Sequence, residues 1–301
     1  MRAGKMHADE TDHDVPLVRR LIAAQFPQWS DLPVEPFDSS GTDNAIYRLG
    51  ADMSVRLPRR PGSTTQIAKD LHWLPKLAPL LPFPIPVPLA AGEPAEDYPL
   101  PWSVHRWLDG ENPAPGHLTR PALLAEDLAA FITAFRRIDL PGAPPAYRGG
   151  PLEKLDLQTR TAIHDLGASI DPMAATAAWE AALNAPGWTS PPVWTHADLM
   201  PGNLLVTDGR LTAVIDFSTA GRGDPAADLM IAWNLLPATV REDFREAVKA
   251  DDATWSRARG RALSIALIAL PYYKATNPAF AANARHVIQE VLTDHQHAGD
   301  A

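Results

Sequence analysis

The segment VWTHADLMPGNLLVTDGRLTAVIDF, residues 193–217, is mostly apolar, yet it contains polar side chains that follow neither a helical nor a strand alternation. These side chains belong to His196, Asp198, Asn203 and Asp216. Burying a carboxylate is costly unless a nearby charge or a metal ion compensates it. We therefore expect these polar groups to lie at the edge of a cleft, where a ligand completes their charge balance.

The spacing within this segment predicts a hairpin. The apolar runs GNLLVTDG and RLTAVIDF have the composition of β-strands, and TDGR is typical of the turn between them. Before the first strand the chain reads H-x-D-x-x-x-x-N, and Asp216 follows thirteen residues after Asn203, at the end of the second strand. A hairpin of this kind would bring three oxygen-bearing side chains to one edge.

Two carboxylates and an amide at one edge suit phosphoryl transfer. One carboxylate can orient an attacking hydroxyl and accept its proton, while the other, with the amide oxygen, holds Mg²⁺ on the phosphates of a nucleotide. The H-x-D-x-x-x-x-N pattern alone is a weak signal, because short patterns of common residues arise by chance. Its position at the opening of a hairpin that ends in IDF makes the signal much stronger.

The stretches HADLMPGN, AVIDF and GRGDPAADL resemble the aminoglycoside phosphotransferase family, a branch of the protein-kinase-like fold. The similarity extends from about residue 35 to residue 275. It implies an α+β, bilobal protein-kinase-like fold. We expect a small antiparallel-sheet N-terminal lobe at residues 1–108, which binds the nucleotide. A larger, mainly helical C-terminal lobe at residues 109–301 would carry out catalysis and bind the acceptor.

The resemblance also assigns roles within the hairpin region. Asp198 matches the catalytic base, and Asn203 and Asp216 match the Mg²⁺ ligands. Three further residues are implied to be structural, bracing this loop or capping the helix that follows: His196, Asp224 and Asp228.

The nucleotide lobe departs from the family pattern at its central cation. The family places a phosphate-contacting lysine on the third strand, whereas MSVRLPR has Arg56 there. Arginine can contact both phosphate and carboxylate through its planar fork, and Asp70 on the following helix is the expected acidic partner. The alternative for Arg56 is an ordinary arginine on a strand surface.

Main-chain groups are expected to make the remaining nucleotide contacts. FDSSGTDNAIYRL has a single glycine, and backbone N–H groups around Ser40 and Gly41 could cover phosphates, although this is also an ordinary turn sequence. The resemblance implies that backbone groups near Arg106 and Leu108 meet the nucleotide base.

Hydrophobic periodicity predicts the remaining elements. In the N-terminal part we expect a helix capped by Asp14, a hairpin formed by AIYRLG and MSVRLPR, a helix over 64–81 interrupted at Pro75, and a strand at 102–108. The proline-rich segment 82–94 is predicted to be a stiff extended connector. Five helices are predicted in the C-terminal part, at 121–138, 175–185, 225–236, 241–250 and 254–273.

Composition limits the partners and the location of the protein. The chain has 301 residues, a formal charge of −9 and no cysteine. The negative charge argues against nucleic-acid polymers and membranes as partners, and the lack of cysteine excludes thiol catalysis and cysteine-ligated metals. The sequence has no apolar run of 18 residues, and its first residues are too charged for a signal peptide, so a cytoplasmic protein is expected.

The sequence thus predicts a Mg²⁺-dependent small-molecule kinase that transfers the γ-phosphate of ATP or GTP to a hydroxyl of an antibiotic or metabolite. One alternative is a non-catalytic nucleotide-binding pseudokinase module. The arginine at position 56 and the single glycine in the nucleotide loop favour it. The three polar residues of the hairpin, Asp198, Asn203 and Asp216, argue against it. A metal-dependent hydrolase that uses His196 and Asp198 as ligands would need further histidines at ligand spacing.

Overall fold

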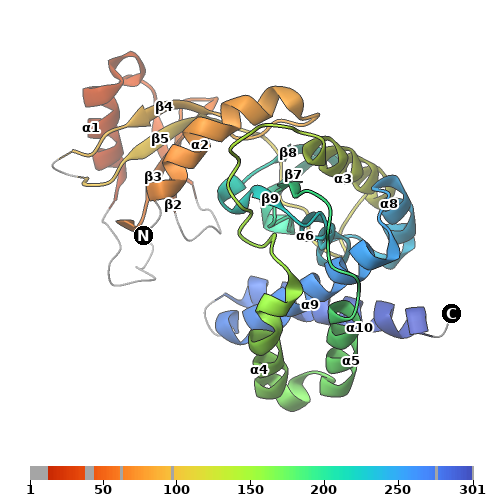
Figure 1. Cartoon of the computed structure of the whole chain (residues 1–301). Coiled ribbons are helices and arrows are strands. Elements are labelled where there is room, and N and C mark those ends of the chain that lie inside the picture. Colours follow the sequence, from red (N-terminus) through yellow and green to blue (C-terminus); the bar gives the residue numbers. More distant parts are fainter. Residues whose placement is uncertain (1–12, 38–43, 62–63, 96–97, 275–276, 300–301) are drawn as a thin grey trace. The chain divides into compact units, whose positions relative to one another are not determined.

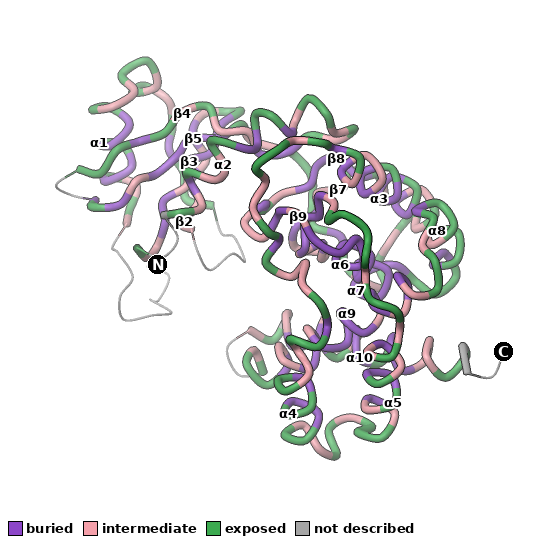
Figure 2. The backbone as a smooth tube through the Cα atoms, viewed as in Figure 1, coloured by how far each residue is buried: buried purple, intermediate pink, exposed green. Residues whose placement is uncertain are grey.

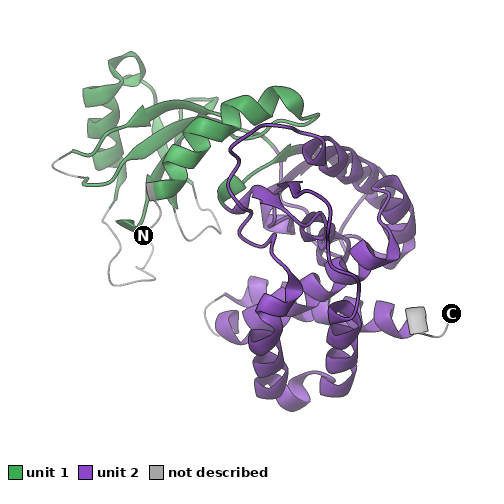
Figure 3. Ribbon diagram, in the orientation of Figure 1, with its two compact units in different colours: residues 1–109, 213–218 green, residues 110–212, 219–301 purple. Residues whose placement is uncertain are grey.

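The computed structural model describes residues 13–37, 44–61, 64–95, 98–274 and 277–299 (Figure 1). The chain forms two compact units, which consist of residues 1–109 with 213–218 and of residues 110–212 with 219–301 (Figure 3). No helix in the described ranges is long and apolar enough to cross a membrane.

A short segment around Asp216 belongs to the first unit, although it comes late in the sequence. The sequence-based division places everything after residue 108 in the second lobe, whereas residues 213–218 belong to the first unit. Within that unit the backbone N–H of Val214 donates to the carbonyl of Pro84 at 3.1 Å. The candidate metal ligand Asp216 is therefore held by the first unit.

The first unit is built on an antiparallel sheet with the strand order β1-β2-β3-β5-β4. Its strands are β1 (Val34–Phe37), β2 (Asn44–Leu49), β3 (Met53–Pro58), β4 (Pro88–Gly92) and β5 (Trp102–Arg106). The predicted hairpin is β2 and β3, and β5 forms where a strand was expected, although it ends at Arg106. Alternate residues of β2 are buried, as the period of a half-buried strand requires.

Two helices accompany this sheet: α1 (Val15–Gln25) and α2 (Thr64–Leu77). Asp14 caps α1 as predicted, because its side chain accepts a hydrogen bond from the N–H of Leu17 at 2.8 Å. The predicted interruption at Pro75 is wrong, since α2 continues through it to Leu77. After Leu77 the chain leaves α2 for a short 3-10 turn at Ala78–Leu80.

The prediction of a connector at 82–94 is wrong for part of that segment, because Pro88–Gly92 forms β4. This strand lies at the edge of the sheet, and Pro88 is its first residue. Proline is tolerated at those positions since no neighbouring strand needs its missing N–H. The pairing of β4 with β5 is irregular between Pro88 and Ala90.

The second unit is mainly helical. Its helices are α3 (Pro121–Arg136), α4 (Asp156–Leu166), α5 (Pro172–Leu183), α6 (Ala226–Leu229), α7 (Ile231–Asn234), α8 (Arg241–Ala247), α9 (Asp252–Tyr273) and α10 (Pro278–Gly299). The sequence patterns did not predict α4 and α10, and the single helix expected at 225–236 is divided into α6 and α7. Most of α9 is buried, as Figure 2 shows, because it packs against α4, α5, α6 and α10.

Two small sheets frame the quoted segment. β6 (Val193–Thr195) pairs antiparallel with β9 (Gly221–Gly223), and β7 (Leu204–Thr207) pairs with β8 (Arg210–Val214). The β7–β8 pair is the predicted hairpin, and Asp208 and Gly209 at its turn both have positive φ, as a tight hairpin turn requires. Together with the first unit's sheet and the helical second unit, these elements confirm the predicted fold class.

The contact between α5 and α9 depends on a glycine. A Cβ atom at Gly260 of α9 would collide with the Cβ atom of Ala182 on α5. Gly260 lies between Arg257 and Arg261, which both make hydrogen bonds outside the helix. The close approach of the two helices therefore sets the position of both arginines.

We expect Gly260→Ala to lower the free energy of unfolding by about 1–3 kcal/mol, because overpacking of a close-packed site outweighs the gain in helix propensity of about 1 kcal/mol. Urea denaturation monitored by circular dichroism measures this change. The double variant Gly260→Ala/Ala182→Gly restores the clearance and should recover part of the loss. An increase in stability of the single variant would show that the helices do not meet at this glycine.

Candidate active site

The loop after β6 is held by a buried carboxylate. Asp228 of α6 accepts hydrogen bonds from the backbone N–H groups of His196 and Ala197, at 3.1 and 2.8 Å. Ala197 has a φ of 62°, a left-handed conformation that costs a non-glycine residue free energy. On the other side of the loop, the hydroxyl of Thr219 donates to the carbonyl of His196 at 2.7 Å. These contacts fix the backbone immediately before Asp198.

Asp228 is fully buried, and burial raises its pKa. The His196 ring, the two backbone donors and the charge of Arg136 oppose this effect by stabilising the ionised form. A carboxylate in such a position acts as an acceptor for the loop. The resemblance implied that Asp228 is structural, and its contacts have that character.

Asp198 lies at the partly exposed edge of this loop, with 17% of its side chain exposed. The side-chain amide of Asn203 donates to the backbone carbonyl of Asp198 at 2.9 Å and to its Oδ2 at 3.2 Å. Since the amide nitrogen is used in this way, the Oδ1 atom of Asn203 remains as a potential ligand for a cation. The structure thus brings Asp198 and Asn203 together, as the sequence predicted.

Sequence reasoning did not identify the cation beside Asp198. Arg148 forms an ion pair with the Oδ1 atom of Asp198, from a loop about fifty residues earlier in the chain. The sequence AYRGGP carries no recognised motif, and only the tertiary structure brings it to the candidate base.

Asp216 belongs to the first unit and has a φ of 60°. Its Oδ1 atom accepts a hydrogen bond from the N–H of Ser218 at 3.2 Å. That contact closes a tight turn at Asp216–Ser218. The Oδ2 atom of Asp216 accepts no hydrogen bond from the described residues. A carboxylate oxygen of this kind has the chemistry that Mg²⁺ prefers.

The expected pairing of Arg56 with Asp70 is electrostatic. Arg56 lies on β3, between Ile46 of β2 and Ser103 of β5, and its charge interacts with those of Asp70 and Asp216. No hydrogen bond joins Arg56 to Asp70 within the described ranges, and the Nε atom of Arg56 is buried without a partner there. A buried donor in this state favours an added acceptor, such as a phosphate oxygen.

Burial raises the pKa of Asp70 to about 6. The positive charge of Arg56 and a hydrogen bond from Gln66 oppose the shift. The Asp70 carboxyl group is therefore half protonated near pH 6 and mostly ionised at pH 7, and its pKa depends on the cations around it.

Lys69 is a second residue that sequence reasoning missed. Its ammonium group donates to the carbonyl of Ser218 at 2.7 Å, which links α2 to the turn that contains Asp216. Burial lowers the pKa of Lys69, while the charges of Asp70 and Asp216 favour its protonated form. The signal in the sequence was that Lys69 stands next to Asp70 on the same helix, but the family pattern assigns a role to Asp70 alone.

The segment after β5 contains the residues predicted to meet the nucleotide base. The N–H of Arg106 donates to the carbonyl of Val87 at 3.4 Å, so this donor is engaged, whereas the N–H of Leu108 has no partner among the described residues. Ser40 and Gly41, the expected phosphate-covering residues, lie outside the described residues. His105 is buried, and burial followed by the charge of Arg56 lowers its pKa well below the usual value.

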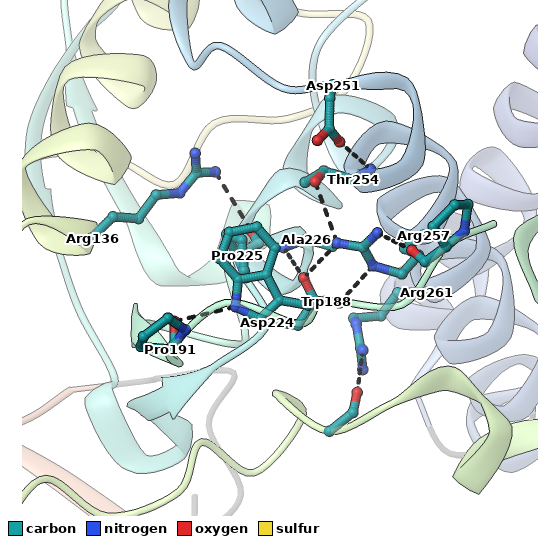
Figure 4. Close-up of polar contacts among 12 residues, drawn as sticks. Arg136, Trp188, Pro191, Asp224, Pro225, Ala226, Asp251, Thr254, Arg257 and Arg261 are labelled. Atoms are coloured by element: carbon teal, nitrogen blue, oxygen red, sulfur yellow. Dashed lines mark hydrogen bonds and ion pairs between the residues drawn. The ribbon is translucent and has the colours of Figure 1, made fainter.

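Asp224 supports the second unit rather than the reaction. It accepts two hydrogen bonds from Arg257 at 2.8 and 3.1 Å and one from the N–H of Ala226 at 2.9 Å (Figure 4). The pair is buried, with both side chains under a tenth exposed. As the resemblance implied, Asp224 acts at the start of α6 as a structural residue.

The described residues contain no group of three or more His, Asp or Glu side chains arranged to hold a metal ion. The side chains of Asn203 and Asp216 each carry an oxygen of the kind that binds Mg²⁺.

We expect the Asp70 carboxyl group to titrate near pH 6, which carboxyl ¹³C NMR of the free protein measures. Asp70→Asn identifies the resonance by its loss. Arg56→Gln should move the midpoint upward, because it removes the charge that favours the carboxylate. Since the folded pKa lies above the unfolded value of about 4, the stability linked to this group is complete below about pH 4 and is lost as the pH rises through about 6. A midpoint that does not respond to Arg56→Gln would contradict this coupling.

The chain is similar to known phosphotransferases. A model of the family described as "Phosphotransferase enzyme family" matches residues 34–263. An aminoglycoside 3′-phosphotransferase of Escherichia coli is 38% identical over 58 residues, which are 19% of this chain and 21% of that protein. The matched part thus spans about a fifth of the curated relative.

Solved structures share the fold at low sequence identity. The GDP and kanamycin complex of APH(2″)-IIIa aligns with a TM-score of 0.72 and 19% identity, covering 92% of this chain and 99% of that one. Macrolide 2′-phosphotransferase of Brachybacterium faecium aligns with a TM-score of 0.64 and 24% identity, covering 91% and 97%. The family model covers well over half of the sequence, and the chain belongs to the phosphotransferase enzyme family.

Proposed function

We propose that this protein is a small-molecule kinase that transfers the γ-phosphate of ATP or GTP to a hydroxyl group of an antibiotic or metabolite. The observation that carries the proposal is the environment of the Asp198 carboxylate. Its carboxylate is partly exposed, oriented by Asn203 and by Arg148, and carried on a loop that Asp228 fixes. A carboxylate constrained in this way suits a general base that must meet a hydroxyl in one geometry.

In the proposed reaction, Asp198 accepts the proton of the acceptor hydroxyl as the acceptor oxygen bonds to the γ-phosphorus. The bond between the γ-phosphorus and the β–γ bridging oxygen breaks, and the nucleoside diphosphate leaves with that oxygen. Asn203 and Asp216 would hold Mg²⁺, which neutralises phosphate charge when bound.

The first unit is proposed to bind the nucleotide. Arg56 would contact the α- and β-phosphates through its unpartnered Nε and the remainder of its fork, with Asp70 limiting its movement. Backbone N–H groups at Ser40 and Gly41 would cover the phosphates. The groups at Arg106 and Leu108 would meet the base, and the free N–H of Leu108 supports that role.

The acceptor is proposed to be an antibiotic or a metabolite with an alcohol group. Support comes from the aminoglycoside and macrolide phosphotransferases that share this fold, although a shared fold does not determine a substrate. ATP and GTP are intracellular nucleotides, so a reaction in the cytoplasm fits the proposal. Antibiotic resistance would be its consequence if the acceptor is a drug.

A pseudokinase module is the alternative that the arginine at position 56 favours. It would bind nucleotide without turnover. The hydrogen bonds between Asp198 and Asn203 favour the enzyme, because a chain without catalytic function has no need for an oriented, partly exposed carboxylate.

We expect purified protein to consume ATP or GTP in the presence of one acceptor from a panel of aminoglycosides, macrolides and hydroxylated metabolites. With that acceptor, Asp198→Ala should lower kcat by roughly 10²–10⁴-fold, the range for loss of a general base, while nucleotide affinity stays within about twofold. A coupled assay of diphosphate release and calorimetric titration of nucleotide measure the two effects.

Asp165→Ala is the matched control, since Asp165 is an exposed aspartate near the end of α4. It should retain the full rate. Wild-type turnover in Asp198→Ala would exclude the assigned base. Nucleotide binding without consumption across the whole panel would favour the pseudokinase module.

A further inference from the structure

We propose that Arg148 is a positioning residue for phosphoryl transfer, which holds the carboxylate of Asp198 and offsets its charge beside the incoming nucleotide. This inference rests on the proposed function, because it takes Asp198 to be the base. It concerns a residue outside the H-x-D-x-x-x-x-N motif and outside the stretches HADLMPGN, AVIDF and GRGDPAADL.

The first argument is the ion pair itself. The Nη1 atom of Arg148 bonds Oδ1 of Asp198, while Asn203 donates to Oδ2. The two side chains are 30% and 17% exposed, so the pair lies at the rim of the site and is partly shielded from water. With one donor on each oxygen, the plane of the carboxylate is set, and each oxygen keeps a lone pair for a hydroxyl.

The second argument is electrostatic. A general base for phosphoryl transfer is an anion that must operate within a few ångströms of the anionic γ-phosphate, and like charges at such separations repel strongly at low effective dielectric. A guanidinium on the base reduces this repulsion without removing the proton acceptor. The guanidinium has five N–H donors, of which the ion pair uses a single one.

The third argument is that the loop carrying Arg148 is anchored on both sides. The N–H of Ala146 donates to the carbonyl of Arg222, and the N–H of Tyr147 donates to the carbonyl of Thr219, each at 3.0 Å. After Arg148, the carbonyl of Gly149 accepts from the N–H of Asp224 at 3.0 Å. The loop is thus bonded to the chain that includes β9.

Arg261 of α9 supports the same loop from another element. Its Nη2 atom donates to the carbonyl of Gly150 at 2.6 Å. Arg261 is 2% exposed, so this donor is a fixed part of the interior. Arg148 therefore projects from a backbone that is held on each side of it.

The glycines of β9 explain how the loop comes so close. A Cβ atom at Gly223 would lie 2.5 Å from the Cα atom of Gly149, and one at Gly221 would lie 2.5 Å from the carbonyl oxygen of Pro144. Both distances are far inside van der Waals contact, so no side chain fits at either position. The GRG sequence of the motif GRGDPAADL thus allows the backbone contact that places Arg148 at Asp198.

The test uses the full-length protein with the acceptor identified by the nucleotide-consumption screen. Arg148→Ala should lower kcat roughly 100-fold, the scale of a misplaced catalytic group, and leave the KM for nucleotide within about twofold. Guanidinium chloride at millimolar concentration should restore part of the lost rate, a response that a folding defect would not show. Arg148→Lys should retain an intermediate rate, because an ammonium keeps the charge but lacks the planar fork.

Gly223→Ala tests the loop contact independently. It should also lower kcat. The double variant with Arg148→Ala should have a kcat little below that of Arg148→Ala, because both changes remove the same interaction between Arg148 and Asp198. Gly187→Ala is the matched glycine control, since nothing lies within 4 Å of an added Cβ there. Arg160→Ala removes an exposed arginine that pairs with Asp156 and Glu180, and should leave kcat unchanged.

The outcomes separate this inference from the proposed function. If Asp198→Ala is inactive and Arg148→Ala keeps the wild-type kcat, the role of Arg148 is wrong and the base assignment stands. A rise in kcat for Arg148→Ala also overturns the inference, because the ion pair would then restrain the base. Retained turnover in Asp198→Ala overturns the proposed function itself. A loss of kcat without guanidinium rescue, in a variant with unchanged thermal stability, also counts against Arg148.

Discussion

The buried carboxylate of Asp228 is the constraint on which the candidate active site depends. It accepts the N–H groups of His196 and Ala197 and so holds the loop in a left-handed conformation at Ala197. A non-glycine residue keeps that conformation when surrounding contacts overdetermine it. Because Asp198 follows directly, the direction of its side chain is set from within the second unit.

Similar side chains acquire different tasks from their surroundings. Asp228 is fully buried and serves backbone donors, and Asp224 is buried against Arg257, so both are structural. Asp198 is partly exposed, and an arginine and an amide donate hydrogen bonds to its oxygens. The difference lies in solvent access and in the available donors. A ligand cannot exchange a proton with a carboxylate that is buried and bonded to protein donors.

Local patterns predicted much of the architecture. The hairpin of β7 and β8, the helices α1 and α3, and the proximity of Asp198 to Asn203 follow from short-range periodicity, turn residues and a five-residue spacing. The errors have tertiary causes. Pro75 remains inside α2, and β4 forms from a proline-rich segment because it lies at the edge of the sheet, where a missing donor is tolerated.

The sequence by itself determined the family and the α+β fold, and it predicted a candidate base and its neighbouring amide, because the loop and the hairpin that carry them are encoded in consecutive residues. Tertiary structure alone decided that Arg148 meets Asp198, that Lys69 holds the carbonyl of Ser218, and that residues 213–218 join the first unit. Those contacts join residues about 50 and 149 positions apart along the chain. The contact of Arg148 also requires the backbones at Gly223 and Gly149 to lie close together, and local periodicity in the sequence cannot predict such a contact.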